Sequence, residues 1–232
     1  MANCCLKIFK IKKMKYYVFT YTGKPIGESG ENLGTKYNFD NACEICGSGA
    51  IVEEKLRCSK IDTTLKDIFQ TLDGDYIISE NLYNRMINDN IDVVNLKNVS
   101  NRRGDNLPFY HFFSAIRLPK AYETKGLILE NQCKVCKRDG HFNDMVMGNL
   151  EDHTPSKILP VQLLYNKRDL DLIHQFDILS TWEHMGISNK KATGNLVVRY
   201  ARPMLVVSDS IKEIMEKLQL ENLKFEPIKT LL

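Results

Sequence analysis

The C-terminal part of the chain contains the stretch Leu205-Val206-Val207-Ser208-Asp209-Ser210-Ile211, in which a short apolar segment runs into a serine and an acid. Apolar β-branched residues favour a strand. Serine is a preferred helix N-cap, and an acid in the first turn suits the helix dipole. The following apolar residues recur at the spacing of one helical face: Ile211, Ile214, Met215 and Leu218. The stretch therefore predicts a strand followed directly by an amphipathic helix.

The same pattern occurs in the first half of the chain, in Tyr76-Ile77-Ile78-Ser79-Glu80-Asn81-Leu82, with 129 positions between the two serines. A further apolar segment follows each predicted helix, and it begins at Asn90 in the first copy and at Asn222 in the second, 132 positions apart. This difference predicts that the second helix is about one turn longer. We interpret the copies as two βαβ-like repeats, one in each half. A chance match of a common local pattern is the alternative.

The rest of the sequence mixes strand and helix patterns. Segments rich in β-branched and aromatic residues predict strands at 16–21, 51–58, 107–118 and 158–165. Helices are expected at 64–71 and at 170–185, the latter starting near Asp177 and carrying Trp182. The aromatic run in 107–118 favours core packing over stacking on nucleic-acid bases. The expected fold class is α+β, with mixed sheets and a few short helices.

The bulk properties fit a globular protein. Hydrophobic residues make up 43% of the 232 residues and charged residues 26%, and there is no low-complexity segment or evident linker. We therefore expect a single α+β domain over residues 14–232. Residues 1–13 have no continuous apolar region and no small-residue cleavage site, so they do not resemble a signal peptide. They are expected to be a disordered tail or the result of a start codon assigned too far upstream.

Charge and cysteine content restrict the class of partner and the compartment. The net charge is only +3, and lysines alternate with acids along the chain, which disfavours nucleic acid and anionic membranes as partners. No segment approaches the ~18 apolar residues of a membrane span. The seven cysteines are an odd number, and no export signal accompanies them. A reducing compartment, the cytoplasm, is therefore expected.

Four cysteines form two CxxC pairs, Cys43 with Cys46 and Cys133 with Cys136. A CxxC pair places two thiolates on one tight turn, and zinc takes four such ligands in a tetrahedron at ~2.3 Å. We predict that these four cysteines bind one structural Zn²⁺, with knuckles at residues 40–50 and 130–141. The ion would join parts of the fold that are distant in sequence. Four thiolates would leave no open position for catalysis.

Several details of this interpretation stay open. A redox role for the pairs would need a helix N-terminus to lower the thiol pKa. Cys58 is expected to be a buried apolar residue, although it or His141 could replace one ligand. Gly47 follows the first pair and suits a positive φ. Lys137 stands at the same place after the second pair, so the second turn is expected to differ.

Other catalytic signatures are missing from the sequence. We find no phosphate-binding loop, no dinucleotide fingerprint, and no HExxH or GxSxG motif. His174, Glu183 and His184 match no metal-ligand spacing and are expected at the surface or at helix caps. A protein that is not an enzyme is therefore favoured. An enzyme with an unrecognised site is one alternative. A zinc-ribbon nucleic-acid binder is another, because basic residues flank the second pair: Lys134, Lys137 and Arg138.

The cysteine pairs and the C-terminal segment together resemble a bacterial family. Cys43-Glu44-Ile45-Cys46-Gly47 matches a CxxCG motif, and residues 202–228 are similar to the family's C-terminal segment. The family comprises the double-CxxCG motif proteins and the related DUF1629-like immunity proteins of polymorphic toxin systems. The second pair departs from the motif because Lys137 replaces its glycine. The resemblance implies a cytoplasmic, non-enzymatic immunity protein that binds and neutralises a cognate toxin. It does not identify the contact residues.

Overall fold

The fold is α+β, as predicted. The computed structural model describes residues 14–62, 67–93, 95–143, 160–171, 176–188 and 201–231. The helices are η1 (Glu31–Leu33, a 3₁₀ turn), α1 (Glu80–Asn88), α2 (Lys167–Asp171) and α3 (Asp209–Lys217). The strands are β1 (Tyr16–Tyr21), β2 (Glu28–Ser29), β3 (Tyr37–Asn38), β4 (Ile51–Val52), β5 (Leu56–Ser59), β6 (Ile68–Gln70), β7 (Tyr76–Ser79), β8 (Lys97–Ser100), β9 (Asn106–His111), β10 (Glu123–Lys125), β11 (Ile128–Leu129), β12 (His141–Phe142), β13 (Gln162–Asn166), β14 (Ile178–Met185), β15 (Arg202–Ser208), β16 (Leu223–Pro227) and β17 (Lys229–Leu231).

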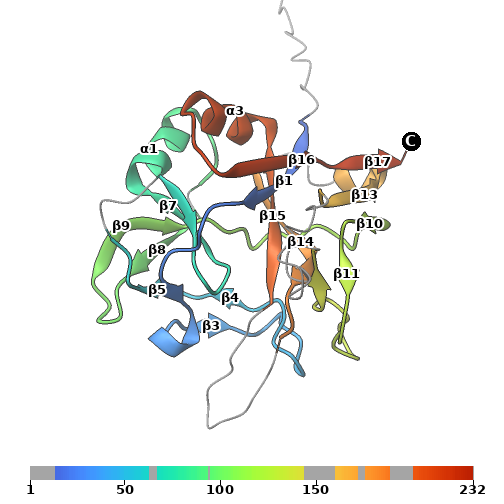
Figure 1. Ribbon diagram of the computed structural model, residues 1–232, viewed down its shortest axis with the longest axis horizontal. Helices are drawn as coiled ribbons and strands as arrows, with labels where there is room; N and C mark the ends of the chain where they lie inside the picture. Colours follow the sequence, from blue (N-terminus) through green and yellow to red (C-terminus); the bar gives the residue numbers. More distant parts are fainter. Residues whose placement is uncertain are drawn as a thin grey trace, which may run out of the picture.

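The two predicted repeats are present as two split βαβ units (Figure 1). In the second unit, β15 and β16 both pair antiparallel with β1, so they run parallel to each other with β1 between them and α3 connecting them. In the first unit, β7 and β8 both pair antiparallel with β9 and are connected by α1. The four-stranded orders β6-β7-β9-β8 and β14-β15-β1-β16 are therefore equivalent.

Strand register extends the repeat at one constant offset. Ile78 faces Ile68 in the first unit, and Val207, 129 positions after Ile78, faces Ile178 in the second. At the far strand, Asn98 faces Tyr110 and Pro227 faces Tyr17, and Asn98 and Pro227 are again 129 positions apart. No residue is inserted between these points. The predicted longer second helix is therefore wrong, because α1 and α3 both contain nine residues.

Both helices also end in the same way. Asn90 and Gln219 each follow the C-cap residue with a positive φ, 60° and 53°. The next N–H then reaches back into the helix, from Ile91 to the carbonyl of Met86 and from Leu220 to the carbonyl of Met215. This is a Schellman-type end. The counterpart of Asn90 is therefore Gln219, and the predicted match with Asn222 is corrected.

The helix starts are equivalent as well. Ser79 Oγ accepts the N–H of Leu82 at 3.1 Å, and Ser208 Oγ accepts the N–H of Ile211 at 3.3 Å. Each serine donates its hydroxyl to an aspartate, Ser79 to Asp67 and Ser208 to Asp177. Asp177 thus supports the start of α3 and begins no helix of its own. The predicted helix at 170–185 is wrong, since strand β14 occupies its second half, residues 178–185. Among its described residues only Leu170 and Asp171, at the end of α2, are helical.

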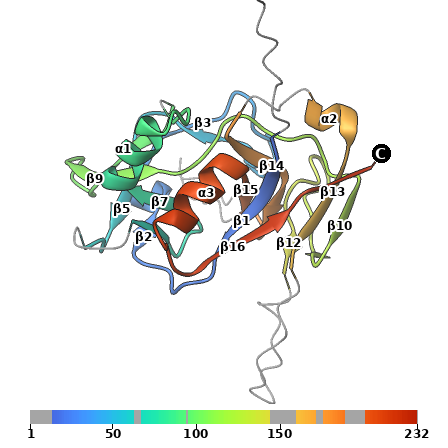
Figure 2. The ribbon, with the colours of Figure 1, turned by 90° about the horizontal axis from the view of Figure 1, so that it is seen from above.

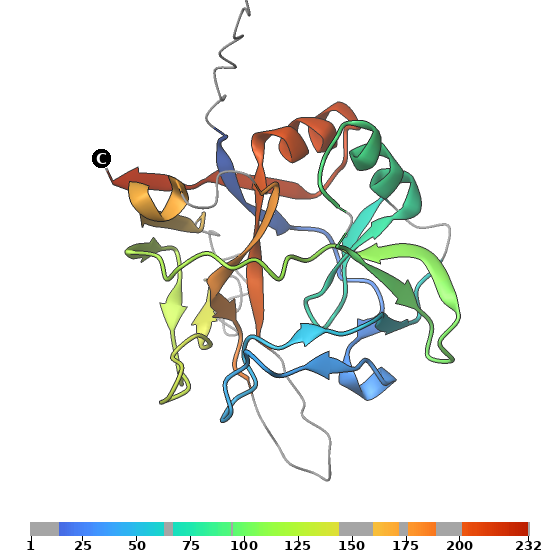
Figure 3. The ribbon, with the colours of Figure 1, turned by 180° about the vertical axis from the view of Figure 1, so that it is seen from behind.

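A shared core joins the two units. The helices α1 and α3 lie side by side (Figures 1 and 3), and their buried residues pack in one cluster: Leu82, Met86, Ile211, Ile214 and Met215. Phe19 of β1 and Phe112 after β9 occupy equivalent positions in the two repeats. Phe19 lies opposite Leu205, and Phe112 lies beside Tyr76. Their rings meet edge to face with centroids 6.0 Å apart. Contact between equivalent residues is the geometry of two halves related by an approximate two-fold axis.

The second unit is covered on both faces. Leu205 and Val207 of β15 face the shared core, whereas Met204 and Val206 face a second core with Tyr165 and Leu179. Figure 2 shows the sheet β14-β15-β1-β16 between helices α1 and α3 on one side and the small sheet β10-β13-β17 on the other. Burial on both faces explains why β15 is apolar without alternation.

A buried ion pair also ties the units together. Arg202 Nε, at the start of β15, lies 2.9 Å from Asp75 Oδ1, just before β7. Ser29 Oγ donates to the other carboxylate oxygen at 2.7 Å, and His111 Nε2 lies 3.6 Å from Oδ1. Burial alone would raise the pKa of Asp75, but Arg202 and His111 hold it well below its usual range. Removing one partner of such a pair costs about 3–5 kcal/mol.

Other expectations changed in detail. The predicted strand 51–58 is two strands, β4 and β5, and the strand within 107–118 ends at His111. Phe109 and Phe112 are buried, as the core interpretation requires. Where residues 64–71 are described, they contain strand β6 and no helix. Residues 1–13 and 158–159 lie outside the described residues. Helices α1, α2 and α3 all lack the length and apolar character of a membrane-crossing helix.

Candidate metal centre

Each CxxC pair lies in the loop of a short hairpin. Cys43 and Cys46 lie between β3 and β4, and Cys133 and Cys136 lie between β11 and β12. In both loops the residue after the second cysteine donates its N–H to the carbonyl of the first, at 2.7 Å from Gly47 and 3.0 Å from Lys137. Both residues have positive φ, 74° and 55°. The second turn was expected to differ, but it has the same shape, with lysine in the glycine conformation.

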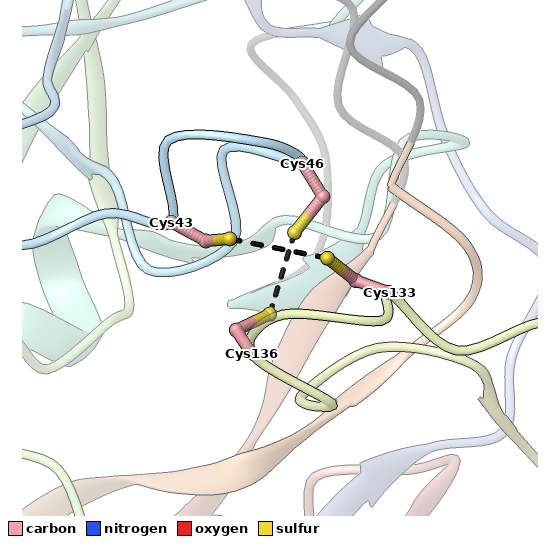
Figure 4. Close-up of side chains that lie close together, drawn as sticks. All are labelled: Cys43, Cys46, Cys133 and Cys136. Atoms are coloured by element: carbon pink, nitrogen blue, oxygen red, sulfur yellow. Dashed lines mark hydrogen bonds between the residues drawn. The ribbon is translucent and has the colours of Figure 1, made fainter.

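The four predicted cysteines come together at one point (Figure 4). Their sulfur atoms all lie within 4.8 Å of one another. Across the knuckles, the Sγ atoms are 3.9 Å apart for Cys43 and Cys133, and 3.4 Å apart for Cys46 and Cys136. A tetrahedron with ~2.3 Å zinc–sulfur bonds has edges of about 3.8 Å. The cluster therefore fits a metal ion with four thiolate ligands.

No other potential ligand joins the cluster in the described part of the chain. Cys58 is buried on β5 within the shared core, as expected of an apolar residue. His141 is buried on β12, with Nδ1 3.2 Å from the carbonyl oxygen of Arg138. Neither pair begins a helix, so the feature that would favour a redox role is not found at these loops.

The first knuckle is supported by its own backbone. The N–H of Cys43 donates to the carbonyl of Ser48 at 3.0 Å, closing the loop on itself. The hydroxyl of Ser48 lies 3.2 Å from the sulfur of Cys46. Backbone N–H groups of Cys46 and Ile45 lower the pKa of Cys43 to about 7 although burial acts to raise it. The loop therefore favours the thiolate at Cys43.

The second knuckle depends on a buried side chain. Asp139 Oδ1 accepts the N–H of Cys133 at 2.8 Å, and Oδ2 accepts the N–H of Ser188 at 3.0 Å. Asp139 is 1% exposed. Ser188 also meets the first knuckle, with its hydroxyl 3.0 Å from that of Ser48. The segment after β14 thus links the two knuckles.

Backbone bonds fix the second knuckle on β14. The N–H of His184 donates to the carbonyl of Arg138 at 2.7 Å, and the N–H of Gly140 donates to the carbonyl of Gly186 at 2.7 Å. A Cβ on Gly140 would lie 2.3 Å from the carbonyl oxygen of Glu130. The first hairpin, in contrast, contributes Val52 to the shared core. The centre therefore joins a hairpin of that core with one fixed on the second repeat.

Two arginines lie together beside the first knuckle. Arg138 Nη1 lies 3.4 Å from the carbonyl oxygen of Ser48, and Arg117 Nη2 lies 3.3 Å from that of Gly49. Burial, and then the charge of Arg138, lower the pKa of Arg117. Four thiolates with one divalent ion carry a net charge of −2. Such a centre would offset the repulsion between the two guanidinium groups.

Burial raises the pKa of Cys46 and of Cys136. Thiols of this kind keep their protons until a cation binds, so metal binding is coupled to proton release. The sequence did not identify Asp139, Ser188 or Arg117 as supports of the site. The Asp139-Gly140 dipeptide after the second pair is a turn signal that could have drawn attention to Asp139. Ser188 and Arg117 reach the site only through the tertiary fold.

The remaining residues singled out from the sequence lie elsewhere. Glu183 and His184 are fully buried on β14, so their predicted surface or cap position is wrong. Glu183 Oε1 accepts the N–H of Ala121 at 2.8 Å, and burial raises the pKa of Glu183. Burial lowers the pKa of His184 to about 3. His174 lies outside the described residues.

Comparison with protein-family models, with curated proteins and with solved structures gave no match. The resemblance to the double-CxxCG and DUF1629-like immunity proteins therefore stays a prediction from the sequence.

Proposed function

We propose that this chain is a non-enzymatic binding protein held together by a structural zinc ion, and that it neutralises a cognate bacterial toxin in the cytoplasm as an immunity protein. The main support is the cluster of Cys43, Cys46, Cys133 and Cys136 within 4.8 Å. Four thiolates fill a tetrahedral shell, which leaves no position for a substrate or an activated water. The cluster therefore supports a structural role in preference to catalysis.

Zinc is the metal that best suits this donor set. Tetrahedral sites of four sulfurs select zinc or iron. Zinc has no redox chemistry and is common in structural sites of this kind. When bound, it would cross-link the hairpins β3–β4 and β11–β12, which are separate two-stranded sheets. Structural zinc contributes about 10–16 kcal/mol of apparent binding energy in small zinc domains.

The immunity role rests on the sequence resemblance. Residues 202–228, which carry its C-terminal part, form β15, α3 and β16. These elements build the core of the second repeat, and so this part of the resemblance concerns the scaffold. In a protein of this class, the scaffold would be shared, whereas the surface would determine which toxin is bound.

Co-expression tests the immunity role. Toxin-like proteins encoded by the neighbouring genes would be expressed with and without this chain in a sensitive host. We expect growth to be restored by one of them and a stable complex to be recovered on size-exclusion chromatography. A Cys133→Ser variant is the matched control and should lose protection because the fold is weakened. If no neighbouring product is toxic, or if toxicity persists with the folded chain present, the proposal is rejected.

A nucleic-acid role is the second candidate. Lys134 and Lys137 are exposed on the second knuckle, as in zinc ribbons that contact phosphates. The residue of the first knuckle that corresponds to Lys134 is the acidic Glu44, which is also exposed, so the two knuckles differ in charge at this position. A mobility shift with DNA or RNA that weakens steeply with salt would support this role. A binding isotherm that does not change with salt would exclude phosphate contacts of that kind.

A further inference from the structure

A cavity of about 400 Å³ lies between the two repeats, beside the first cysteine hairpin. The segment that follows α1 and the segment that follows β9 form the walls from the first repeat. Residues 176–178 contribute from the second repeat, and β4 contributes from the cysteine hairpin. Ligand pockets usually measure about 300–1,000 Å³ and often lie where structural units meet. The size and the place of this cavity are therefore compatible with a binding site.

The floor of the cavity is apolar. Val93, Leu96 and Ile178 are buried there, and two aromatic residues, Phe113 and Phe176, are half-buried beside them. The ring of Phe113 stacks on that of His111 with the ring centroids 5.3 Å apart, which fixes the orientation of Phe113. A ligand that fills this space must therefore bring an apolar body.

The charged residues of the cavity are mainly acidic. Glu53, Asp92 and Asp177 line it, against a single lysine, Lys97. Asp177 accepts the hydroxyl of Ser208, a neutral partner that leaves its negative charge in place. The chain as a whole has a net charge of +3, so the balance of charge is locally reversed. Low-dielectric walls lined by charge of one sign concentrate the field and attract the opposite sign.

We propose that this cavity is the docking site for an arginine- or lysine-bearing apolar segment of a protein partner. The proposal rests on the proposed function, for which the partner is the toxin. One basic side chain with an apolar neighbour matches the acidic residues and the apolar floor together. Arginine is a frequent anchor in protein interfaces, where it enters desolvated pockets. An acidic segment, a nucleic acid or an anionic membrane would meet repulsion from the same carboxylates.

The probe experiment uses the complete zinc-loaded chain and two short acetylated peptides. One peptide has an arginine between two leucines, and the other has a glutamate in the same place. Amide resonances are followed by NMR as each peptide is raised to millimolar concentration. We expect the arginine peptide to shift the amides of Val52, Leu96 and Phe113, with saturation. We expect the glutamate peptide to leave them unchanged.

Two variants and one control locate the contact. Glu53→Lys should weaken binding of the arginine peptide about three- to tenfold, through a change in one rim charge. Glu54→Lys carries the same charge change on the next residue, which is exposed but does not line the cavity, and should change binding far less. Ala115→Trp places a large ring at an exposed lining position without altering the core, and it should abolish the shifts.

Three outcomes of the peptide experiment overturn the proposal: no shifts with the arginine peptide, equal shifts with both peptides, or shifts that survive Ala115→Trp. The peptides need no toxin, so this result is separate from the co-expression test. If the toxin binds wild type and Ala115→Trp equally well, this inference fails while the immunity role stands. If the arginine peptide binds as expected but no neighbouring toxin is neutralised, the immunity role fails. The cavity then remains a site for a basic, apolar protein segment.

Discussion

The two cysteine knuckles have one shape but different means of support. The first has glycine at its left-handed position and closes on its own backbone through Cys43 and Ser48. The second has Lys137 at that position and is supported by the buried Asp139 and by β14. The comparison shows that a CxxC turn can be closed by backbone bonds alone in one place and by a buried side chain with a further tertiary contact in another. It implies that the second knuckle is the more sensitive to changes outside it.

The largest effect should come from the ligands, where the two knuckles are equal. Cys43→Ser and Cys133→Ser should each remove the metal and cost at least several kcal/mol of unfolding free energy, because binding energy is part of the folding energy. Chemical denaturation of zinc-saturated protein measures this. Cys58→Ser, buried but outside the cluster, is the control that should keep the metal. Retention of zinc by Cys133→Ser would show that the four cysteines are not the ligands.

The next effect should separate the knuckles. Asp139→Ala leaves the half-buried N–H of Cys133 and the buried N–H of Ser188 without acceptors, which should cost about 3 kcal/mol. Ser48→Ala in the first knuckle keeps the backbone bond to Cys43 and should cost about 1 kcal/mol. Denaturation with zinc present compares the two. Asp139→Asn, which keeps one acceptor oxygen, should fall between them. Equal losses would mean that the two knuckles do not differ in their support.

The free energy of unfolding should depend on pH through His184, which lies beneath the second knuckle. Burial lowers the pKa of His184 to about 3 in the folded chain, against about 6.5 when unfolded. Acid therefore protonates the unfolded state first. Stability from this group is complete above pH ~6.5 and falls as pH decreases, by roughly 2 kcal/mol between pH 7 and 5. His184→Gln should remove this component. Parallel stability curves for wild type and variant over that range would contradict it.

The smallest effect should come from the left-handed residues themselves. Lys137→Gly relieves the strain of a side chain at positive φ and should stabilise the protein by about 1 kcal/mol. Lys134→Gly, in the same loop but without a positive φ, should destabilise it slightly. Thermal unfolding of zinc-loaded variants measures both. A loss of stability in Lys137→Gly would indicate that the lysine side chain makes a contact worth more than the strain.

The sequence predicted the parts of the fold that depend on local pattern. The serine caps of both helices and the CxxC turn of each cysteine pair are such parts, because the residues that make them are close neighbours in the chain. The meeting of the two pairs was predicted from the four ligands that zinc takes, since 90 residues separate Cys43 from Cys133. The helix expected at 170–185 was wrong because β14 is buried on both faces. Ile178, Leu179 and Ser180 are all buried, so the alternation that marks a strand is missing.

Other features depend on chain topology. The second repeat is completed by β1, from the start of the chain, whereas the first is completed by β9, which directly follows β8. No local pattern indicates this difference. The supports of the second knuckle are likewise not indicated by local sequence, because Asp139 and Ser188 meet only in the folded chain. The predicted offset after the helices was wrong by three residues, because Asn90 was matched with Asn222 by residue type. Strand register and helix ends show that the counterpart of Asn90 is Gln219.

Native mass spectrometry of the purified chain most directly tests whether one metal ion joins the two knuckles. We expect one zinc ion per folded chain in the wild type and none in either Cys43→Ser or Cys133→Ser. Removal of the ion by a chelator should shift the charge-state distribution towards unfolded protein. A wild-type chain that is metal-free, compact and stable to the chelator would contradict a structural role for a metal ion at the four cysteines.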